Sequence, residues 1–306
     1  MDREIHGPRF LAILESMARS QTLRLNPETI VLHRRNGDVQ FGWDPDSAVV
    51  VAIESSADRR AVLELIRLLD GTLPVAVAVR RAAEAGLPTD RSAQIISDLR
   101  RSGHIVGDRS GSPRTVRVHG DGPLAESISA RLSATSVSVV RSRSVRTLAD
   151  VRRWTCDLVV LADSLVWDPS FIAELLDAGL VHLQVRVRDG KGIVGPLVHP
   201  GVSSCLLCAD LTRSEFDPEW PLLASQLLGK VGLGSPEIIM ATTSFAISEI
   251  HNHFDSEVSR ETVTPNATVE ICTNRLDTGR RHWPIHPDCR CQNLHNHPRR
   301  LADTVS

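Results

Sequence analysis

The N-terminal third of the chain switches from short strand-like apolar runs to a helical period of apolar positions. Its strand patterns lie at residues 30–33, 39–43 and 48–53, and its helical patterns lie at residues 58–69, 74–85 and 89–101. The dipeptide Asn36-Gly37 separates the first two strand patterns. It is typical of a tight hairpin turn, in which both central residues need positive φ. Three strands followed by three helices predict a small winged-helix-like α+β domain.

The pattern changes after a polar, turn-rich stretch at residues 108–113. The strand patterns beyond it lie at residues 115–120, 137–140, 157–162 and 181–187, and the helical patterns lie at residues 124–132 and 169–178. This alternation is typical of a parallel, Rossmann-like sheet. We therefore predict the fold class α/β, with a winged-helix-like domain at residues 1–110 and a Rossmann-like domain at residues 111–306.

Composition and charge exclude several classes of partner. Hydrophobic residues make up 42% of the chain, charged residues make up 24%, and the formal net charge is -2. Nothing therefore draws the whole chain to nucleic acid or to an anionic membrane. The sequence contains no run of about 20 uncharged apolar residues, and its first residues lack the basic start and apolar core of a secretion signal. We expect a cytoplasmic protein with no membrane partner.

Four of the cysteines form two close pairs, Cys205 with Cys208 and Cys289 with Cys291. In a reducing compartment such pairs favour a metal ion over disulfides, and four thiolates form the ligand set of a closed, structural zinc site. The second pair has the spacing Cys-x-Cys, which leaves a histidine ligand as an alternative to one thiolate. The histidines available for that role are His286, His295 and His297. We predict that zinc staples the C-terminal segment to the second domain.

A glycine-rich turn, Gly120-Asp121-Gly122, lies between the first strand and the first helix of the second domain. A Rossmann domain places its phosphate-binding loop there. Ala125 stands where the third glycine of the fingerprint is expected. The second strand runs into Arg141 instead of the acidic residue that would hold a ribose. We interpret the loop as vestigial: Gly120 and Gly122 preserve the fold, and ATP is not expected on this chain.

The strands and helices of the first domain have two alternative uses. A DNA reader would place residues 89–101 in the major groove, but acidic residues interrupt the basic stripe that a duplex requires, so nucleic acid is not the expected partner. A peptide-binding module would instead add an extended ligand to the edge of residues 48–53 and pack it against the last helix. The residues predicted to form this groove are Val49, Val51, Ile53, Arg91, Ile95 and Leu99.

Two parts of the sequence resemble known families. Residues 39–45 and 65–72, with the helix end at residues 99–106, resemble the PqqD-like recognition element for ribosomal-peptide precursors. The block at residues 195–220 begins Gly-Pro-Leu-Val-His-Pro-Gly, contains the Cys-x-x-Cys pair and ends in Asp-Pro-Glu-Trp. It looks like the ThiF-like partner proteins of thiazole/oxazole-modified microcin cyclodehydratases.

The resemblance implies a function in the biosynthesis of modified peptides. In that family the recognition element binds the leader of a precursor peptide, and the ThiF-like domain is a scaffold. A separate YcaO-type protein performs the ATP-driven cyclisation of Cys, Ser or Thr side chains. The chain would then be a non-catalytic subunit more than an enzyme on its own, and Arg91 would pair acidic leader residues. ThiF-like relatives commonly form dimers, so the resemblance also implies a homodimer.

Two other functions remain open at this stage. A ThiF-like adenylyltransferase would activate a carboxylate and bind ATP at residues 120–125. A zinc-responsive winged-helix regulator would bind a DNA duplex in a salt-dependent way.

Overall fold

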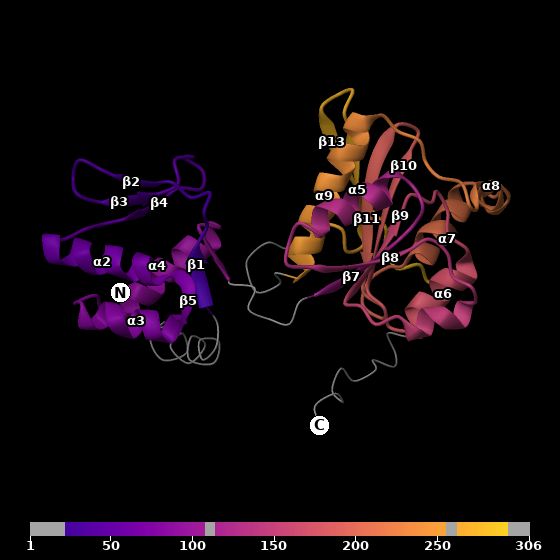
Figure 1. Ribbon diagram of the computed structural model, residues 1–306. Coiled ribbons are helices and arrows are strands. Elements are labelled where there is room, and N and C mark those ends of the chain that lie inside the picture. The colour runs from indigo at the N-terminus through magenta and orange to yellow at the C-terminus, as the bar shows by residue number, and fades with distance from the viewer. Residues whose placement is uncertain (1–21, 108–113, 255–261, 293–306) are drawn as a thin grey trace. The chain divides into compact units, whose positions relative to one another are not determined.

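The computed structural model describes residues 22–107, 114–254 and 262–292. Within them the chain divides into two compact units, drawn in Figure 1. The first unit holds residues 22–107, and the second holds residues 114–254 and 262–292.

The first unit contains two small antiparallel sheets and a group of helices (Figure 1). Its strands are β1 (Thr22–Leu25), β2 (Val31–His33), β3 (Val39–Phe41), β4 (Val49–Val51), β5 (Asp70–Pro74) and β6 (Ile105–Gly107), and its helices are α2 (Ser56–Leu68), α3 (Val75–Glu84) and α4 (Thr89–Arg101). The strands pair in the orders β5-β1-β6 and β2-β3-β4. The predicted hairpin, third strand and helices are confirmed. The sheet β5-β1-β6 is not among the predicted elements, because its strands are short and contain few consecutive apolar residues.

The turn between β2 and β3 differs from the predicted one. The N–H of Arg34 donates to the carbonyl of Asp38 (2.9 Å), and the N–H of Gly37 donates back to the carbonyl of Arg34 (3.0 Å), so the loop is five residues long, 34–38. Gly37 has a φ of 97°, whereas Asn36 is not among the residues with positive φ. Asn36 acts through its side chain, which donates to the carboxylate of Asp38 (2.7 Å). The longer loop therefore needs left-handed backbone only at the glycine.

The core of the first unit lies between the helices and the hairpin sheet. The helix α4 buries Ile95, Ile96 and Leu99, which join Phe41 from β3 and Leu65 from α2 in one apolar cluster. Leu99 is completely buried. Each such side chain removed from water stabilises the fold by roughly 1.5–3 kcal/mol.

The second unit is built on a seven-stranded mixed sheet. Its strands are β7 (Thr115–His119), β8 (Ser138–Ser142), β9 (Leu158–Ala162), β10 (His182–Arg188), β11 (Lys191–Val198), β12 (Ala267–Cys272) and β13 (Asp277–His282). Its helices are α5 (Pro123–Leu132), the 3-10 helix η1 (Leu148–Arg153), α6 (Pro169–Asp177), α7 (Leu206–Phe216), α8 (Trp220–Leu227) and α9 (Pro236–Phe254). The strand order is β13-β12-β11-β10-β9-β7-β8. The mixed α/β fold is confirmed.

The sheet is only partly parallel, which corrects the predicted Rossmann-like pattern. The strands β8, β7, β9 and β10 are parallel, and β11, β12 and β13 extend the sheet in antiparallel pairs. The dipeptide Asp189-Gly190, with φ values of 51° and 73°, forms the two-residue turn from β10 to β11. That dipeptide is a hairpin signal in the sequence, so this reversal was readable without the structure.

Helices cover both faces of the sheet (Figure 1). The helices α5 and α9 pack on one face, and α6 and α7 pack on the other. The strand β9 is buried along its whole length, as expected for a strand covered on both sides. Among the described residues no helix combines the length and the apolar character needed to cross a bilayer.

Burial of histidines predicts an acid-sensitive second unit. His182 on β10 is completely buried, and desolvation lowers its pKa to about 4 despite a contact of its Nδ1 with the carbonyl of Leu180 (2.9 Å). Between about pH 6.5 and pH 4 the unfolded chain therefore binds a proton that the folded chain does not. We expect His182 to remove about 2 kcal/mol from the free energy of unfolding by pH 5. Urea unfolding at pH 7 and pH 5 measures this loss.

The variant His182→Gln should show a smaller loss of stability between the two pH values. The control is His33→Gln, because His33 on β2 is exposed. An equal pH dependence in the native chain and in His182→Gln would contradict the prediction.

Candidate functional site

The second unit brings the four predicted cysteines together. Cys205 is the N-cap of α7 and Cys208 lies in its first turn, whereas Cys289 and Cys291 follow β13. The Sγ–Sγ distances are 3.8 Å for Cys205–Cys208, 3.6 Å for Cys205–Cys289 and 3.4 Å for Cys208–Cys291. All four sulfurs lie within 4.8 Å of one another. Tetrahedral bonds of about 2.3 Å place sulfurs about 3.8 Å apart, so the residues fit a four-coordinate metal ion.

Burial of the four thiols agrees with this fit. Each of these four cysteines is at most 4% exposed, so a substrate has little access to the sulfurs among the described residues. The thiol contact between Cys205 and Cys208 lowers the pKa of Cys208 and raises the pKa of Cys205. Such a set of sulfur ligands favours soft or borderline metal ions such as zinc or iron. A closed set of four is typical of a structural centre.

The sequence block before Cys205 builds the loop that carries the first cysteine pair. Gly201 has a φ of 74° and turns the chain after β11. The hydroxyl of Ser203 accepts from the N–H of His199 (2.9 Å), and the N–H of Ser204 donates to the side chain of Asn266 (2.6 Å). These bonds fix the start of α7 beside the start of β12. The sequence block at residues 195–220, which carries the resemblance, thus holds the first cysteine pair in place.

Of the three histidines that could replace a thiolate ligand, the structure describes only His286. His286 is buried, and its Nε2 lies 2.9 Å from a carboxylate oxygen of Glu215, while its Nδ1 accepts from the N–H of Asp288 (3.1 Å). Both ring nitrogens therefore face partners other than the sulfurs, and His286 supports the turn that carries Cys289. His295 and His297 lie outside the described residues.

The glycine-rich loop contains an anion supplied by the chain itself. The carboxylate of Asp163, which follows β9, accepts from the N–H groups of Leu124 (2.9 Å) and Ala125 (3.0 Å) at the start of α5. A helix N-terminus of this kind is where a phosphate binds in nucleotide-binding folds. Asp163 is buried, and desolvation raises the pKa of its carboxyl group. The sequence offered no signal for this contact, because the partners lie 38 and 39 residues apart.

Close packing against the end of β9 explains both glycines of the loop. A Cβ at Gly120 would lie 2.4 Å from the carbonyl oxygen of Ala162, and a Cβ at Gly122 would lie 2.7 Å from the carboxylate of Asp163. Gly120 also has a φ of 155°, close to the limit of what other residues adopt. Packing within the chain thus accounts for both glycines: Gly120 lies against backbone, and Gly122 lies against the side chain of Asp163.

A surface groove lies between β4 and α4 in the first unit. In the described part of the chain β4 pairs only with β3, so its other edge is open. A cavity of about 300 Å³ follows this edge. The residues that line it are Val49, Val50, Val51, Ala52, Glu54, Arg91, Gln94, Ile95 and Asp98. The strand supplies an apolar wall, and the helix supplies a mostly polar one.

The predicted groove residues occupy different places. Val49, Val51, Arg91 and Ile95 line the cavity, whereas Ile53 and Leu99 do not. Leu99 lies in the core, because α4 turns its Ile96 and Leu99 side inward. The cavity-facing positions of α4 are Arg91, Gln94, Ile95 and Asp98, which repeat at helical spacing. That spacing is a signal from which the sequence alone could have identified Gln94 and Asp98.

Arg91 is held by partners within the first unit. Its Nη2 lies 2.8 Å from a carboxylate oxygen of Asp58 and also donates to the carbonyl of Ala52. The N–H of Ile53 donates to the carboxylate of Asp38 (2.9 Å). These contacts close the exposed edge of the strand beyond Val51. Arg91 therefore sets the spacing between strand and helix, and its charge is already balanced by Asp58.

Comparison with known proteins identifies the fold. No protein-family model matches the chain, and no curated protein sequence is similar to it. Among solved structures, a heterocyclase in complex with substrate and cofactor is similar at 14% identity over 87% of this chain and 39% of its own, with a TM-score of 0.58. The heterocyclase TruD is similar at 15% identity over 89% of this chain and 43% of its own, with the same TM-score of 0.58.

A third similar structure is MccB of E. coli with ATP, at 11% identity over 88% of this chain and 99% of its own, with a TM-score of 0.54. The chain thus spans about two fifths of the heterocyclase chains and nearly the whole of MccB. Both kinds of neighbour share its fold, in agreement with the resemblance found in the sequence.

The cysteine cluster predicts a metal-dependent second unit. We expect the purified protein to carry about one metal ion per chain, and Cys208→Ser to lose that ion, because three buried sulfurs hold a metal ion less tightly than four. The loss of stability should exceed the roughly 1 kcal/mol typical of a single substitution. Elemental analysis and thermal unfolding measure the two effects. The matched control is Cys272→Ser on β12, outside the cluster; equal metal content in both variants would contradict the prediction.

Proposed function

We propose that this chain binds the leader of a ribosomally synthesised precursor peptide and presents it to a separate YcaO-type cyclodehydratase. It would act as a non-catalytic scaffold with a winged-helix-like, PqqD-like first unit and a zinc-stapled, ThiF-like second unit. The observation that carries the proposal is the open edge of β4 beside the cavity lined by α4. An extended peptide can pair with such an edge and place alternate side chains in the cavity.

The geometry of the edge limits how much of a leader it can hold. The strand β4 spans Val49–Val51, and the contacts of Arg91 and Asp38 close the backbone groups that follow it. Only a short segment of the leader therefore pairs with the strand. The rest of the leader's affinity for the groove must come from its side chains. Val50 is 40% exposed and lines the cavity, so an apolar leader residue can pack against it.

The charges around the groove bear on the leader's composition. Glu54 and Asp98 line the cavity, and Arg91 is paired with Asp58. Pairing of Arg91 with an acidic leader residue would have to displace Asp58. Apolar contacts and main-chain hydrogen bonds are therefore the main source of affinity in the proposal.

The comparisons support a role in peptide modification. The neighbours include two heterocyclases, and one MccB structure contains the N-formylated peptide MccA. The chain corresponds to only 39% and 43% of the two heterocyclase chains. Cyclisation by a separate YcaO-type protein is part of the proposal and rests on the resemblance found in the sequence. The homodimer that the resemblance implies stays a prediction.

The cysteine cluster and the glycine-rich loop support the scaffold function. Four buried thiolates are the ligand set of structural zinc, which would tie the segment after β13 to α7. Asp163 already satisfies two N–H donors that a nucleotide phosphate would use. Both features favour a structural scaffold over an adenylating enzyme.

Charge on the exposed strand edge should weaken leader capture. In Val50→Lys the ammonium group would have to be buried against the apolar part of a bound leader, so we expect the affinity to fall at least about tenfold. The measurement is fluorescence anisotropy with a labelled synthetic leader of the precursor peptide.

Leu32→Lys is the matched control, because Leu32 lies on β2 in the same sheet with a similar exposure of 39% and does not line the cavity. Both variants should keep the melting temperature of the native chain. Equal leader affinity in the native chain and in Val50→Lys would place the binding site elsewhere.

The glycine-rich loop leads to a prediction about nucleotide chemistry. We expect no exchange of pyrophosphate into ATP by the purified chain, with or without precursor peptide, because the carboxylate of Asp163 occupies and charges the phosphate-binding position. Radiolabelled pyrophosphate makes the assay sensitive. Exchange above background would favour the ThiF-like adenylyltransferase and would sink the scaffold proposal.

A further inference from the structure

An arginine-rich cavity of about 1110 Å³ lies at the end of β10 in the second unit. It is bounded by α7, by the start and end of α8, by the segment at residues 231–233 and by the segment at residues 281–284. Its arginines are Arg186, Arg188, Arg213 and Arg281. Neither the cysteine cluster nor the groove at β4 includes these residues.

Three of the four arginines have carboxylate partners. Glu270 on β12 lies 3.1 Å from Nη2 of Arg188 and 3.5 Å from Nε of Arg281. Asp210 on α7 lies 2.7 Å from Nη1 of Arg213. Glu270 is shared between two arginines, so the two carboxylates balance only part of the positive charge that the cavity walls carry.

Arg186 is the exception. It is 6% exposed and forms no ion pair with any described residue. Its Nη1 donates to the carbonyl of Leu165, and its buried Nε has no hydrogen-bond partner. Burial, with Arg213 and Arg188 nearby, lowers the pKa of Arg186 to about 9, which leaves it protonated at neutral pH.

A buried guanidinium without an anion costs free energy, and the cavity wall is the place where an anion can reach it. A carboxylate would give Arg186 the counter-charge it lacks and can accept from a guanidinium in a bidentate way. Asp189 and Asp217 also line the cavity and are exposed. They would repel a dianion such as a phosphate monoester more strongly than a carboxylate.

The rest of the lining is suited to a polypeptide. Trp220 and Trp283 stack on Arg213, with its guanidinium carbon 5.1 Å and 4.5 Å from the two ring centroids. Phe216 and Leu233 each line the cavity and are each 84% exposed. Large apolar side chains left in water beside a cavity are typical of a binding surface.

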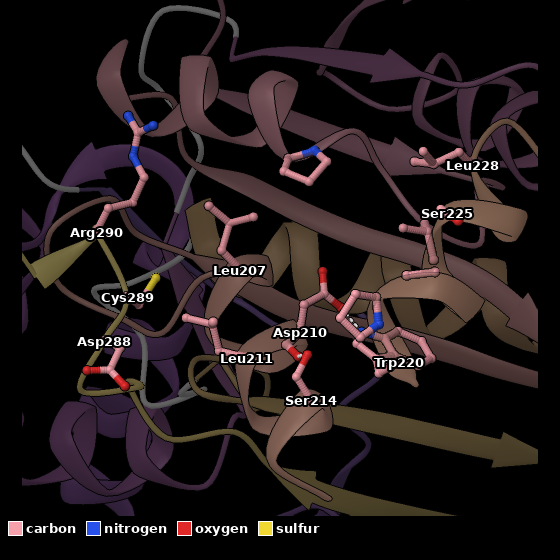
Figure 2. A pocket seen from close by; sticks show the side chains of 14 residues that line it. Leu207, Asp210, Leu211, Ser214, Trp220, Ser225, Leu228, Asp288, Cys289 and Arg290 are labelled. Atoms are coloured by element: carbon pink, nitrogen blue, oxygen red, sulfur yellow. Dashed lines mark hydrogen bonds between the residues drawn. The ribbon is translucent and has the colours of Figure 1, made fainter. Parts of the chain in front are cut away.

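A second, largely apolar cavity of about 530 Å³ shares two lining residues, Val166 and Trp220, with the first. Figure 2 shows this second cavity, with Leu207 and Leu211 of α7 on one side and Leu228 on another. The indole Nε1 of Trp220 donates to Asp210 (3.2 Å), which fixes the ring between the two cavities. Together the two cavities offer an extended surface with one buried positive charge.

We propose that this surface binds an acidic polypeptide segment, one carboxylate of which pairs with Arg186 while neighbouring apolar side chains contact Trp220 and Phe216. The site lies on the second unit and does not rest on leader capture at β4.

The test is isothermal titration calorimetry of the full chain with defined peptides. The first probe is a heptapeptide with one central glutamate between leucine and serine residues, blocked at both ends. The second probe carries glutamine in place of the glutamate. The third carries glutamine and a free C-terminus, and so tells a side-chain carboxylate from a terminal one. The Val50→Lys background weakens binding at β4, so that failure here and failure of leader capture remain distinct.

We expect the glutamate probe to bind about 10- to 100-fold more tightly than the blocked glutamine probe, as for a hydrogen-bonded charge pair. If the site binds a terminal carboxylate, the probe with the free C-terminus should bind more tightly than the blocked glutamine probe. Arg186→Met should abolish the preference and should raise the melting temperature, because an unpaired buried charge is replaced by an apolar group. Arg280→Met on β13 is the control, since Arg280 is exposed and does not line the cavity.

Several results would overturn the assignment. They are equal binding or no binding of the probes, displacement of the glutamate probe by millimolar inorganic phosphate, and an unchanged preference in Arg186→Met. A lower melting temperature in Arg186→Met with the preference retained would show that Arg186 only supports the loop at Leu165.

Discussion

The convergence of four thiols is the constraint on which the architecture of the second unit depends. Cys205 and Cys208 begin α7, and Cys289 and Cys291 come from a segment more than eighty residues further along the chain. Their sulfurs meet in a buried cluster, so the segment after β13 must run beside α7. Both cavities of the second unit are built on that arrangement, because Cys289 lines one and Trp283 lines the other. A metal ion at the cluster would link all these elements at once.

A buried charge needs a partner of opposite charge or polarity, and two buried charges in the second unit differ in whether they have one. Asp163 places a carboxylate on the N-terminus of α5, where its charge is balanced by backbone N–H groups. Arg186 places a guanidinium at the end of β10, where no carboxylate of the described residues meets it. The first arrangement closes a potential anion site from within the chain. The second leaves a site to which an external anion is attracted.

The two proposed peptide-binding surfaces are complementary in kind. The first offers an unpaired strand edge, which recognises main-chain groups with little regard to sequence. The second offers aromatic and apolar walls around one charge, which recognise side chains. Neither surface requires a catalytic group. The proposed scaffold function rests on these two surfaces, and the likeness to heterocyclases and MccB concerns the fold.

The sequence by itself determined many of the local elements and the two close cysteine pairs. The hairpin of β2 and β3, the helices α2 to α4 and the alternation from β7 to β10 follow from periodicity and turn residues, which act over a few positions. The close cysteine pairs were equally visible, since their chemistry restricts what they can do. Only the tertiary structure decided that Leu99 lies in the core, that Arg91 is bound to Asp58, and that Asp163 fills the glycine-rich loop. These contacts join residues that are distant in the sequence, and no local pattern encodes which partner a buried charge meets or fails to meet.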